Sequence, residues 1–243
     1  MELTPKVQFL GMTFDLTIMI GTTVTCVIVF LITFLATRNR SLYPKGLQNV
    51  VEMIIDFAKG IARMAYDQKT AEKYVVFSFT LFLFIMVANQ LGIFLMVTTE
   101  AHQPFPSLGI TESALQESHG INWFKSPTAD LNVALGMAIA VALFTHYVGI
   151  RSGLKNYLGH YISPMGPIHL IEEFSKPLTH GMRLWANIFA GEILITIMIT
   201  EGSPLITGAP LIVWMGFSLF IGVIQAYIFT VLANVYISQK MAH

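Results

Sequence analysis

The sequence predicts an all-α membrane protein with about five membrane-spanning helices, an amphipathic surface helix, and a long, strongly tilted helical hairpin at its end. Hydrophobic residues make up 54% of the 243 residues and charged residues only 12%, about half the charged share of a typical soluble domain. Five apolar runs are long enough to cross a bilayer, which takes about 20 residues of helix. Too little polar surface remains for a water-soluble fold, so residues 1–243 are expected to form a single membrane domain.

The five predicted spans cover residues 16–37, 74–98, 132–150, 166–200 and 209–239. The first span is longer than the apolar core of a signal peptide, so we expect it to be retained as a helix. The last two spans would form helices of roughly 50 and 45 Å, at about 1.5 Å per residue. Because the hydrocarbon layer is only about 30 Å thick, these two helices are expected to form an inclined hairpin. The segment from Gly202 to Pro210 contains helix breakers and is the expected turn.

Residues 45–66, between the first two spans, show an amphipathic pattern. Polar and apolar residues recur there at helical spacing and fall on opposite faces. The polar residues are Lys45, Gln48, Asn49, Glu52, Asp56, Lys59 and Arg63, and the apolar ones are Leu47, Val51, Ile54, Ala58, Ile61 and Ala65. The pattern is typical of a helix that lies on the membrane surface. A helix packed against a soluble partner is the alternative.

The lysines and arginines outside the spans are unevenly distributed between the two sides of the membrane. Ten would share one side: Arg38, Arg40, Lys45, Lys59, Arg63, Lys69, Lys73, Arg151, Lys155 and Lys240. Only Lys6 and Lys125 would share the other. By the positive-inside rule, the N-terminus is expected outside the cell and the C-terminus in the cytoplasm.

Several classes of function receive no support from the residues. The net charge of zero gives no indication of a nucleic-acid partner, and the single cysteine, Cys26, has no partner for a disulfide or a cysteine metal site. His102 and His119 lack metal-ligand spacing, so neither a metal nor a cofactor is expected. The sequence contains no glycine-rich phosphate loop, and the chain alone is not expected to hydrolyse ATP.

The fourth span contains an unusual set of charged and polar residues around Arg183. The set comprises His169, Glu173, Lys176, His180, Arg183, Asn187 and Glu192. Charged side chains inside a bilayer are rare and commonly mark ion or proton routes. At about 100° per residue, Lys176, His180 and Asn187 fall within roughly 60° of Arg183, and Glu192 points to about the opposite side.

The positions along the helix axis predict two access routes separated by Arg183. Glu173 lies ten residues before Arg183 and Glu192 nine residues after it, so each is roughly 14 Å away along the axis. Burial can bring a carboxylate into a range where it exchanges protons. An arginine stays charged and therefore acts as an electrostatic barrier. We interpret the pattern as two water-filled half-channels with a fixed positive charge between them.

Structural roles remain open for some of these residues. Glu173 and Lys176 could form an i,i+3 pair near the interface, Glu192 could bond to a neighbouring helix, and His180 could be a relay or a packed side chain. In the last span, Gln225 could accept a hydrogen bond from Arg183 across the hairpin, and Ser218 shares its face. Asn234, Asn89 and Gln90 could equally be hydrogen-bonding contacts between helices.

Three motifs identify a family. The run Arg183-Leu-Trp-Ala-Asn187-Ile-Phe-Ala-Gly191-Glu192 resembles the signature helix of subunit a of F-type ATP synthases. Two further stretches resemble the same family, Pro127-Thr-Ala-Asp130-Leu-Asn132 before the third span and Gln225-Ala-Tyr-Ile-Phe229 in the last. The resemblance extends over essentially the whole chain and is closer to bacterial than to organellar members.

This resemblance implies a non-catalytic, proton-conducting stator subunit in the bacterial plasma membrane. Its expected partners are a rotating ring of c subunits, the b subunits of the peripheral stalk, the rest of the ATP synthase and the lipid bilayer. Arg183 would face the essential carboxylate of the ring, and Gln225 would support it. Glu192 and Asn187 would belong to the outer half-channel, and Glu173 to the cytoplasmic exit.

The chain also departs from the family pattern. Many members have Phe-Gly where this chain has Trp185-Ala186. Some carry a histidine at the Ser218 position and a glutamate at the His169 position. Because of these two departures, the resemblance does not imply a relay through Ser218 and His169. From their positions in the sequence alone, the relay candidates of this chain are His180, His169 and Ser218.

A secondary transporter that binds a small anionic substrate at Arg183 is the alternative function. Such transporters commonly show paired repeats with two broken helices. The sequence has only one charged, proline-containing span, which favours the stator interpretation. Neither interpretation specifies whether the ion is H⁺ or Na⁺.

Overall fold

The computed structural model describes residues 3–9, 11–99, 105, 108–112, 120–153, 157 and 166–241. Its long helices are α1 (Leu16–Arg38), α2 (Leu47–Ala65), α3 (Gln68–Phe94), α5 (Leu131–Ser152), α7 (Gly166–Thr200) and α8 (Pro204–Met241). All except α2 are long and apolar enough to cross a membrane. The all-α membrane fold with five spans and an additional amphipathic helix is therefore confirmed.

Helices α3 and α8 have other bounds than the predicted spans. Helix α3 begins at Gln68 rather than at residue 74, because the Asp67 carboxylate accepts hydrogen bonds from the backbone N–H groups of Lys69 and Thr70 and caps the helix. The same helix ends at Phe94. Helix α8 begins at Pro204 rather than at residue 209, since proline is tolerated in the first helical turn. The turn of the hairpin is therefore confined to residues 201–203, and Pro210 lies inside the helix.

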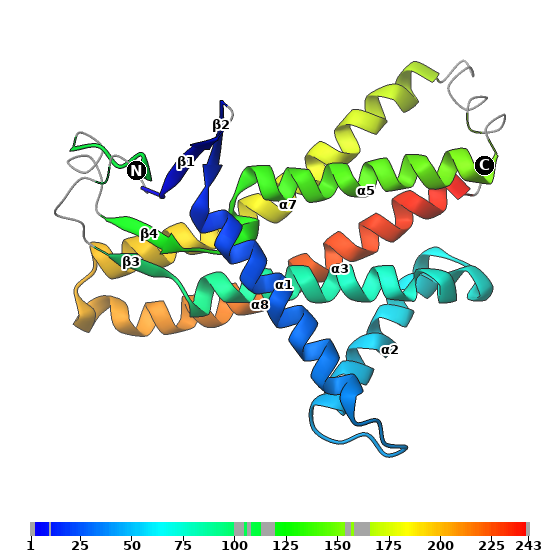
Figure 1. Ribbon diagram of the computed structural model, residues 1–243, viewed down its shortest axis with the longest axis horizontal. Coiled ribbons are helices and arrows are strands. Elements are labelled where there is room, and N and C mark those ends of the chain that lie inside the picture. Colours follow the sequence, from blue (N-terminus) through cyan, green and yellow to red (C-terminus); the bar gives the residue numbers. More distant parts are fainter. Residues whose placement is uncertain are drawn as a thin grey trace.

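The helices α3, α5, α7 and α8 pack together, and α1 lies at the edge of the group. In Figure 1, α3, α5 and α8 run along the long axis of the molecule, whereas α1 crosses them obliquely. Small buried side chains mark the contacts, among them Ala134 and Ala138 of α5 and Ala226 and Ala233 of α8. Small residues let membrane helices approach closely. This close packing fixes the α7–α8 hairpin against α3 and α5.

Helix α2 packs its apolar stripe on α3 and α8. Val51, Ala58 and Ile61 are buried there, as their spacing predicts, whereas Leu47 remains exposed. Phe57 contacts the rings of Phe82 and Tyr227. The helix is therefore amphipathic, and its apolar face is held by the protein itself.

Two small antiparallel sheets are the main feature that the sequence did not predict. Strand β1 (Lys6–Phe9) pairs with β2 (Met12–Asp15), and β3 (Val97–Thr99) pairs with β4 (Ile121–Phe124). The end of the predicted second span, residues 97–98, belongs to β3. Strands of three or four residues are too short to give a recognisable period. A 3-10 turn, η2 (Pro127–Ala129), leads from β4 into α5.

Candidate functional site

The site is built on the antiparallel pair α7 and α8. The rings of His180 and Phe229 are in contact, with centroids 3.7 Å apart. Eleven residues further along α7, the Gly191 carbonyl accepts a hydrogen bond of 3.2 Å from the Trp214 indole N–H. Interpolation between these two contacts brings Gln225 to about the level of Arg183 along the hairpin.

Arg183 lies on an exposed face of α7, together with Asn187. The Asn187 side-chain amide donates to the Arg183 carbonyl oxygen at 2.8 Å, so it braces the backbone and leaves the guanidinium outside. Gln225 is buried, and within the described part of the chain no hydrogen bond joins it to Arg183. A direct support of Arg183 by Gln225 therefore stays a prediction.

His180 points in a different direction from Arg183, although a helical wheel brings the two within about 60°. Its side chain is only 3% exposed and packs edge-on against Phe229 and Tyr236. Among the described residues, no hydrogen-bond partner reaches its Nε2 atom. An unpaired polar atom in such a place is a point where a water molecule would be held.

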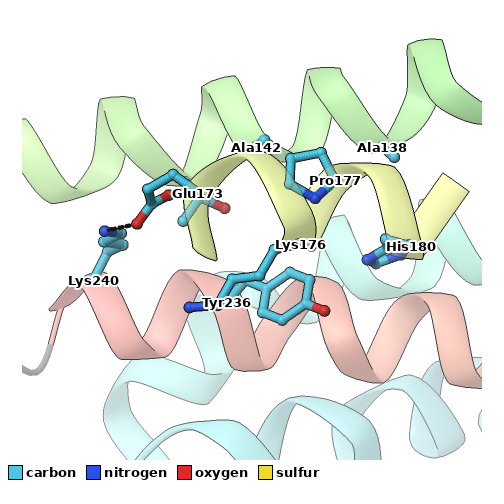
Figure 2. Close-up of a pocket in the computed structure, with 9 residues that line it drawn as sticks. Ala138, Ala142, Glu173, Lys176, Pro177, His180, Tyr236 and Lys240 are labelled. Atoms are coloured by element: carbon cyan, nitrogen blue, oxygen red, sulfur yellow. Dashed lines mark hydrogen bonds and ion pairs between the residues drawn. The ribbon is translucent and has the colours of Figure 1, made fainter. Parts of the chain in front are cut away.

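A first cavity lies beside His180, between α5, α7 and α8 (Figure 2). Its volume of about 20 Å³ holds about one water molecule. Its lining residues are Ala138, Ala142, Thr145, Glu173, Lys176, Pro177, His180, Tyr236 and Lys240. Pro177 has no N–H, so the helical bond to the Glu173 carbonyl is missing and that oxygen can accept from water.

Glu173, which lines this cavity, is held by side chains of α5 and α8. One carboxylate oxygen forms an ion pair with Lys240, drawn as a dashed line in Figure 2. The other oxygen lies 3.3 Å from Nε2 of His146 on α5. Lys176 pairs with Glu172 at 3.2 Å, so the i,i+3 pair of Glu173 and Lys176 considered from the sequence is not the one that forms.

A second cavity, of about 170 Å³, lies at the other end of α7, where several water molecules fit. Asn187, Glu192, Trp214 and Ser218 contribute to its lining. The Ser218 hydroxyl is buried and has no hydrogen-bond partner among the described residues. Both ends of the hairpin therefore carry a cavity, a carboxylate and an unpaired polar atom.

Glu192 is only 7% exposed, and the protein provides a built position for its carboxylate. The Ser126 backbone N–H donates to Oε1 of Glu192 at 3.1 Å. A side chain at Gly92 of α3 would overlap this oxygen and would lie 2.8 Å from the Ser126 nitrogen. The space left by Gly92 is therefore what lets the carboxylate reach its donor.

Polar contacts of Ser126, Thr128 and Asn89 hold the segment that donates to the Glu192 carboxylate. The Ser126 hydroxyl donates to the Ala88 carbonyl and lies 2.7 Å from the Thr128 hydroxyl, which in turn donates to Asn89. The Asn89 amide donates to the Gly222 carbonyl of α8 at 2.7 Å. Asn89 thus joins helices, as expected, and also holds the segment that positions Glu192.

Replacing Gly92 with alanine is expected to lower the free energy of unfolding by about 1–3 kcal/mol, because the methyl group overfills this contact. Gly136→Ala on α5 is the matched control. Nothing lies within 4 Å of a Cβ there, so we expect no loss of stability. Thermal unfolding in detergent measures both, and equal midpoints for the two variants would contradict the close approach.

Sequence reasoning missed several residues of the site. His146, Lys240, Ser126 and Gly92 were not singled out. Ser126 directly precedes the motif Pro127–Asn132 and so adjoins a recognisable signal. His169 belongs to α7, but its side chain lies outside the part of the chain that the structure describes.

Within the described residues, no group of three or more His, Cys, Asp or Glu side chains is arranged to hold a metal ion. The polar groups that line the two cavities include carboxylates, hydroxyls, an amide, an imidazole and two lysine ammonium groups. Such a set can pass protons between neighbouring groups and waters.

Comparison with known proteins gives a consistent result. The family described as ATP synthase A chain matches residues 19–238. The ATP synthase subunit a of Alkalihalophilus pseudofirmus is 41% identical over 246 residues, covering 98% of this chain and 96% of that protein. The protein of the same name from Listeria welshimeri is 43% identical over 249 residues, covering 98% and 97% of the two chains. That from Priestia megaterium is 40% identical over 247 residues, with the same coverage.

Proposed function

The chain belongs to the ATP synthase A chain family, and from this premise we propose that it conducts protons to and from a rotating ring of c subunits. It is a non-catalytic stator subunit of the ATP synthase. The observation that carries the proposal is the pair of cavities on opposite sides of Arg183, one beside Glu192 and one beside Glu173. Arg183 belongs to the lining of neither cavity.

On the outer side, protons would reach the ring through the larger cavity. Glu192 takes up a proton, and Asn187, Ser218 and enclosed waters lead it toward the exposed face of α7. There it would neutralise the ring carboxylate and let that subunit move into the lipid. The Ser126 N–H fixes the carboxylate and so keeps the acceptor at one place in the route.

On the cytoplasmic side, the smaller cavity would receive the proton after the ring has turned. Among the α7 residues that line this cavity, His180 is the nearest to Arg183 along the helix and Glu173 is the furthest from it. His169 is a further candidate for this side, from its place in the sequence. Arg183 would favour release by attracting the ionised ring carboxylate. Its fixed charge would also prevent protons from passing directly between the two routes.

The ring would dock on the exposed faces of α7 and α8. Arg183 and Asn187 lie on this surface of α7, and Ile212 and Val213 are among the exposed apolar residues of α8. A mainly apolar face with one arginine suits a membrane partner that carries an acid group. Gln225, buried at the level of Arg183, would hold the arginine extended toward that partner. The b subunits of the peripheral stalk would contact other helices.

The proposed location is the bacterial plasma membrane, with the N-terminus outside and the C-terminus in the cytoplasm. The ten-to-two distribution of lysine and arginine supports this orientation. The strand β1 and the end of α8 lie at opposite ends of the long axis (Figure 1), as an odd number of crossings requires.

Reconstitution of the membrane sector tests the function. We expect proteoliposomes containing the c ring and the peripheral stalk to conduct protons only when this chain is included, and to make ATP only after the catalytic sector is added. Equal proton flux with and without the chain would refute the stator function. Saturable uptake of an organic anion by the isolated chain would instead indicate the transporter alternative.

A further inference from the structure

We propose that His146 is the residue that exchanges protons with the cytoplasm at the mouth of the smaller cavity, and that it makes proton flux depend on cytoplasmic pH. The inference rests on the proposed function and adds to it a residue on α5, outside the α7–α8 hairpin. His146 belongs to none of the three family-like motifs. Its role follows from the contacts of its two ring nitrogens.

The first contact connects His146 to the cavity. Its Nε2 atom lies 3.3 Å from Oε2 of Glu173, and Oε1 of the same carboxylate forms the ion pair with Lys240. Both Glu173 and Lys240 line the cavity, whereas His146 lies on the far side of the carboxylate. A proton that leaves the cavity past Glu173 therefore meets this imidazole.

The second contact of His146 leads away from the cavity, toward the surface of the protein. The Nδ1 atom of His146 lies 2.7 Å from the Tyr157 hydroxyl, and the two rings meet edge-on. Tyr157 follows the end of α5, in the connection toward α7. The side chain of His146 is 29% exposed, compared with 16% for Glu173 and 11% for Lys240. His146 is thus the most accessible of the three groups.

The other charged groups near His146 are engaged in ion pairs or lie at the surface. Glu173 of α7 and Lys240 of α8 balance each other, and Glu172 and Lys176 form a separate pair nearby on α7. On α5, the helix of His146, the exposed Arg151 donates to the Tyr147 hydroxyl. Imidazole is the one side chain that ordinarily gains or loses its proton between about pH 5 and 8.

The exchange step is a simple proton transfer. One ring nitrogen takes a proton from the Glu173 side, which gives an imidazolium with both nitrogens donating. The other nitrogen then releases its proton through the Tyr157 hydroxyl or to water, and the neutral ring returns. One proton enters and one leaves, so no other reactant is required.

The test uses the whole ATP synthase in proteoliposomes, with the pH on the cytoplasmic face varied and the pH inside held constant. We expect the rate of ATP-driven proton pumping in the wild-type enzyme to show an inflection between about pH 5 and 8. His146→Gln should remove the inflection and lower the rate about tenfold. This is less than the 10²–10⁴-fold typical of a proton-transfer group in a chemical step, because water also reaches this position.

Two further variants separate proton exchange from a structural role. Arg151→Gln removes an exposed charge five residues away on the same helix and should keep the inflection. His146→Ala should be accelerated by imidazole added to the buffer, which a packing defect would not be. An unchanged pH profile in His146→Gln, or a wild-type profile without an inflection, would overturn the proposal.

The Arg183→Ala variant distinguishes a failure of the His146 role from a failure of the stator function. If Arg183→Ala loses coupling while His146→Gln keeps the wild-type profile, only the role of His146 fails. If Arg183→Ala remains coupled, the stator function itself fails.

Discussion

Replacing Arg183 with alanine is expected to abolish ATP synthesis driven by a proton gradient. In the proposed function, the guanidinium is the fixed charge that keeps the two cavities from exchanging protons directly, and alanine supplies neither charge nor bulk. We also expect a proton leak through the membrane sector, because protons could then pass from one cavity to the other without a full turn of the ring. ATP synthesis after an acid–base jump and passive proton flux of the membrane sector measure the two effects.

The alanine variant should assemble normally. Arg183 lies on an exposed face and makes no ion pair within the described residues, and a charge within a span costs at least about 2.5–3.5 kcal/mol. Arg183→Lys is the matched control, since it keeps a positive charge but can lose its proton. It should retain part of the barrier to the leak. Coupling that survives intact in Arg183→Ala would refute the barrier.

The predicted positions of Glu173 and Glu192 on either side of Arg183 depend only on spacing along one helix. The distances from Arg183 to Glu173 and to Glu192 are set by the helical rise. They require no knowledge of neighbouring helices. The excess length of the last two spans likewise follows from residue counts. Helix α7 has the predicted bounds and 35 residues, and α8 is longer than predicted at 38 residues.

Contacts between elements could not be predicted in the same way. The pairing of Glu173 with Lys240 joins residues 67 positions apart, and Glu192 meets Ser126 across 66 positions. A helical wheel put His180 close to Arg183, yet the packing of α8 buries the imidazole and leaves the guanidinium exposed. Which side of a helix is covered depends on the neighbour, and the sequence of one helix does not contain that information.

The two cavities also differ in a way that bears on their roles. Glu192 accepts a bond from the backbone of a segment that is itself held by side-chain bonds, so its position is rigid. Glu173 is held by two side chains, Lys240 and His146, which can reorient. The proposed outer route would therefore have an acceptor at a fixed position. The proposed cytoplasmic route would consist of side chains that can reorient.

Glu192→Gln is expected to slow ATP synthesis by about 100-fold, the lower end of what a positioned proton-transfer group contributes. Glutamine has the shape of glutamate, and its carbonyl oxygen can still accept from the Ser126 N–H, so the local structure should be kept. It cannot take up and release a proton. Proton entry from the outer side should become rate-limiting. The loss should therefore be greatest when the outer solution is least acidic.

A nearby carboxylate provides the control for this prediction. Glu201 follows the last residue of α7 and is exposed, so Glu201→Gln removes the same charge about 14 Å further along the helix axis without touching the cavity. We expect this variant to synthesise ATP at the wild-type rate. Rates of ATP synthesis of the two variants, measured as a function of the outer pH, test this prediction. If Glu192→Gln and Glu201→Gln behave alike, then Glu192 is a structural contact between helices and the outer route runs through other groups of the cavity.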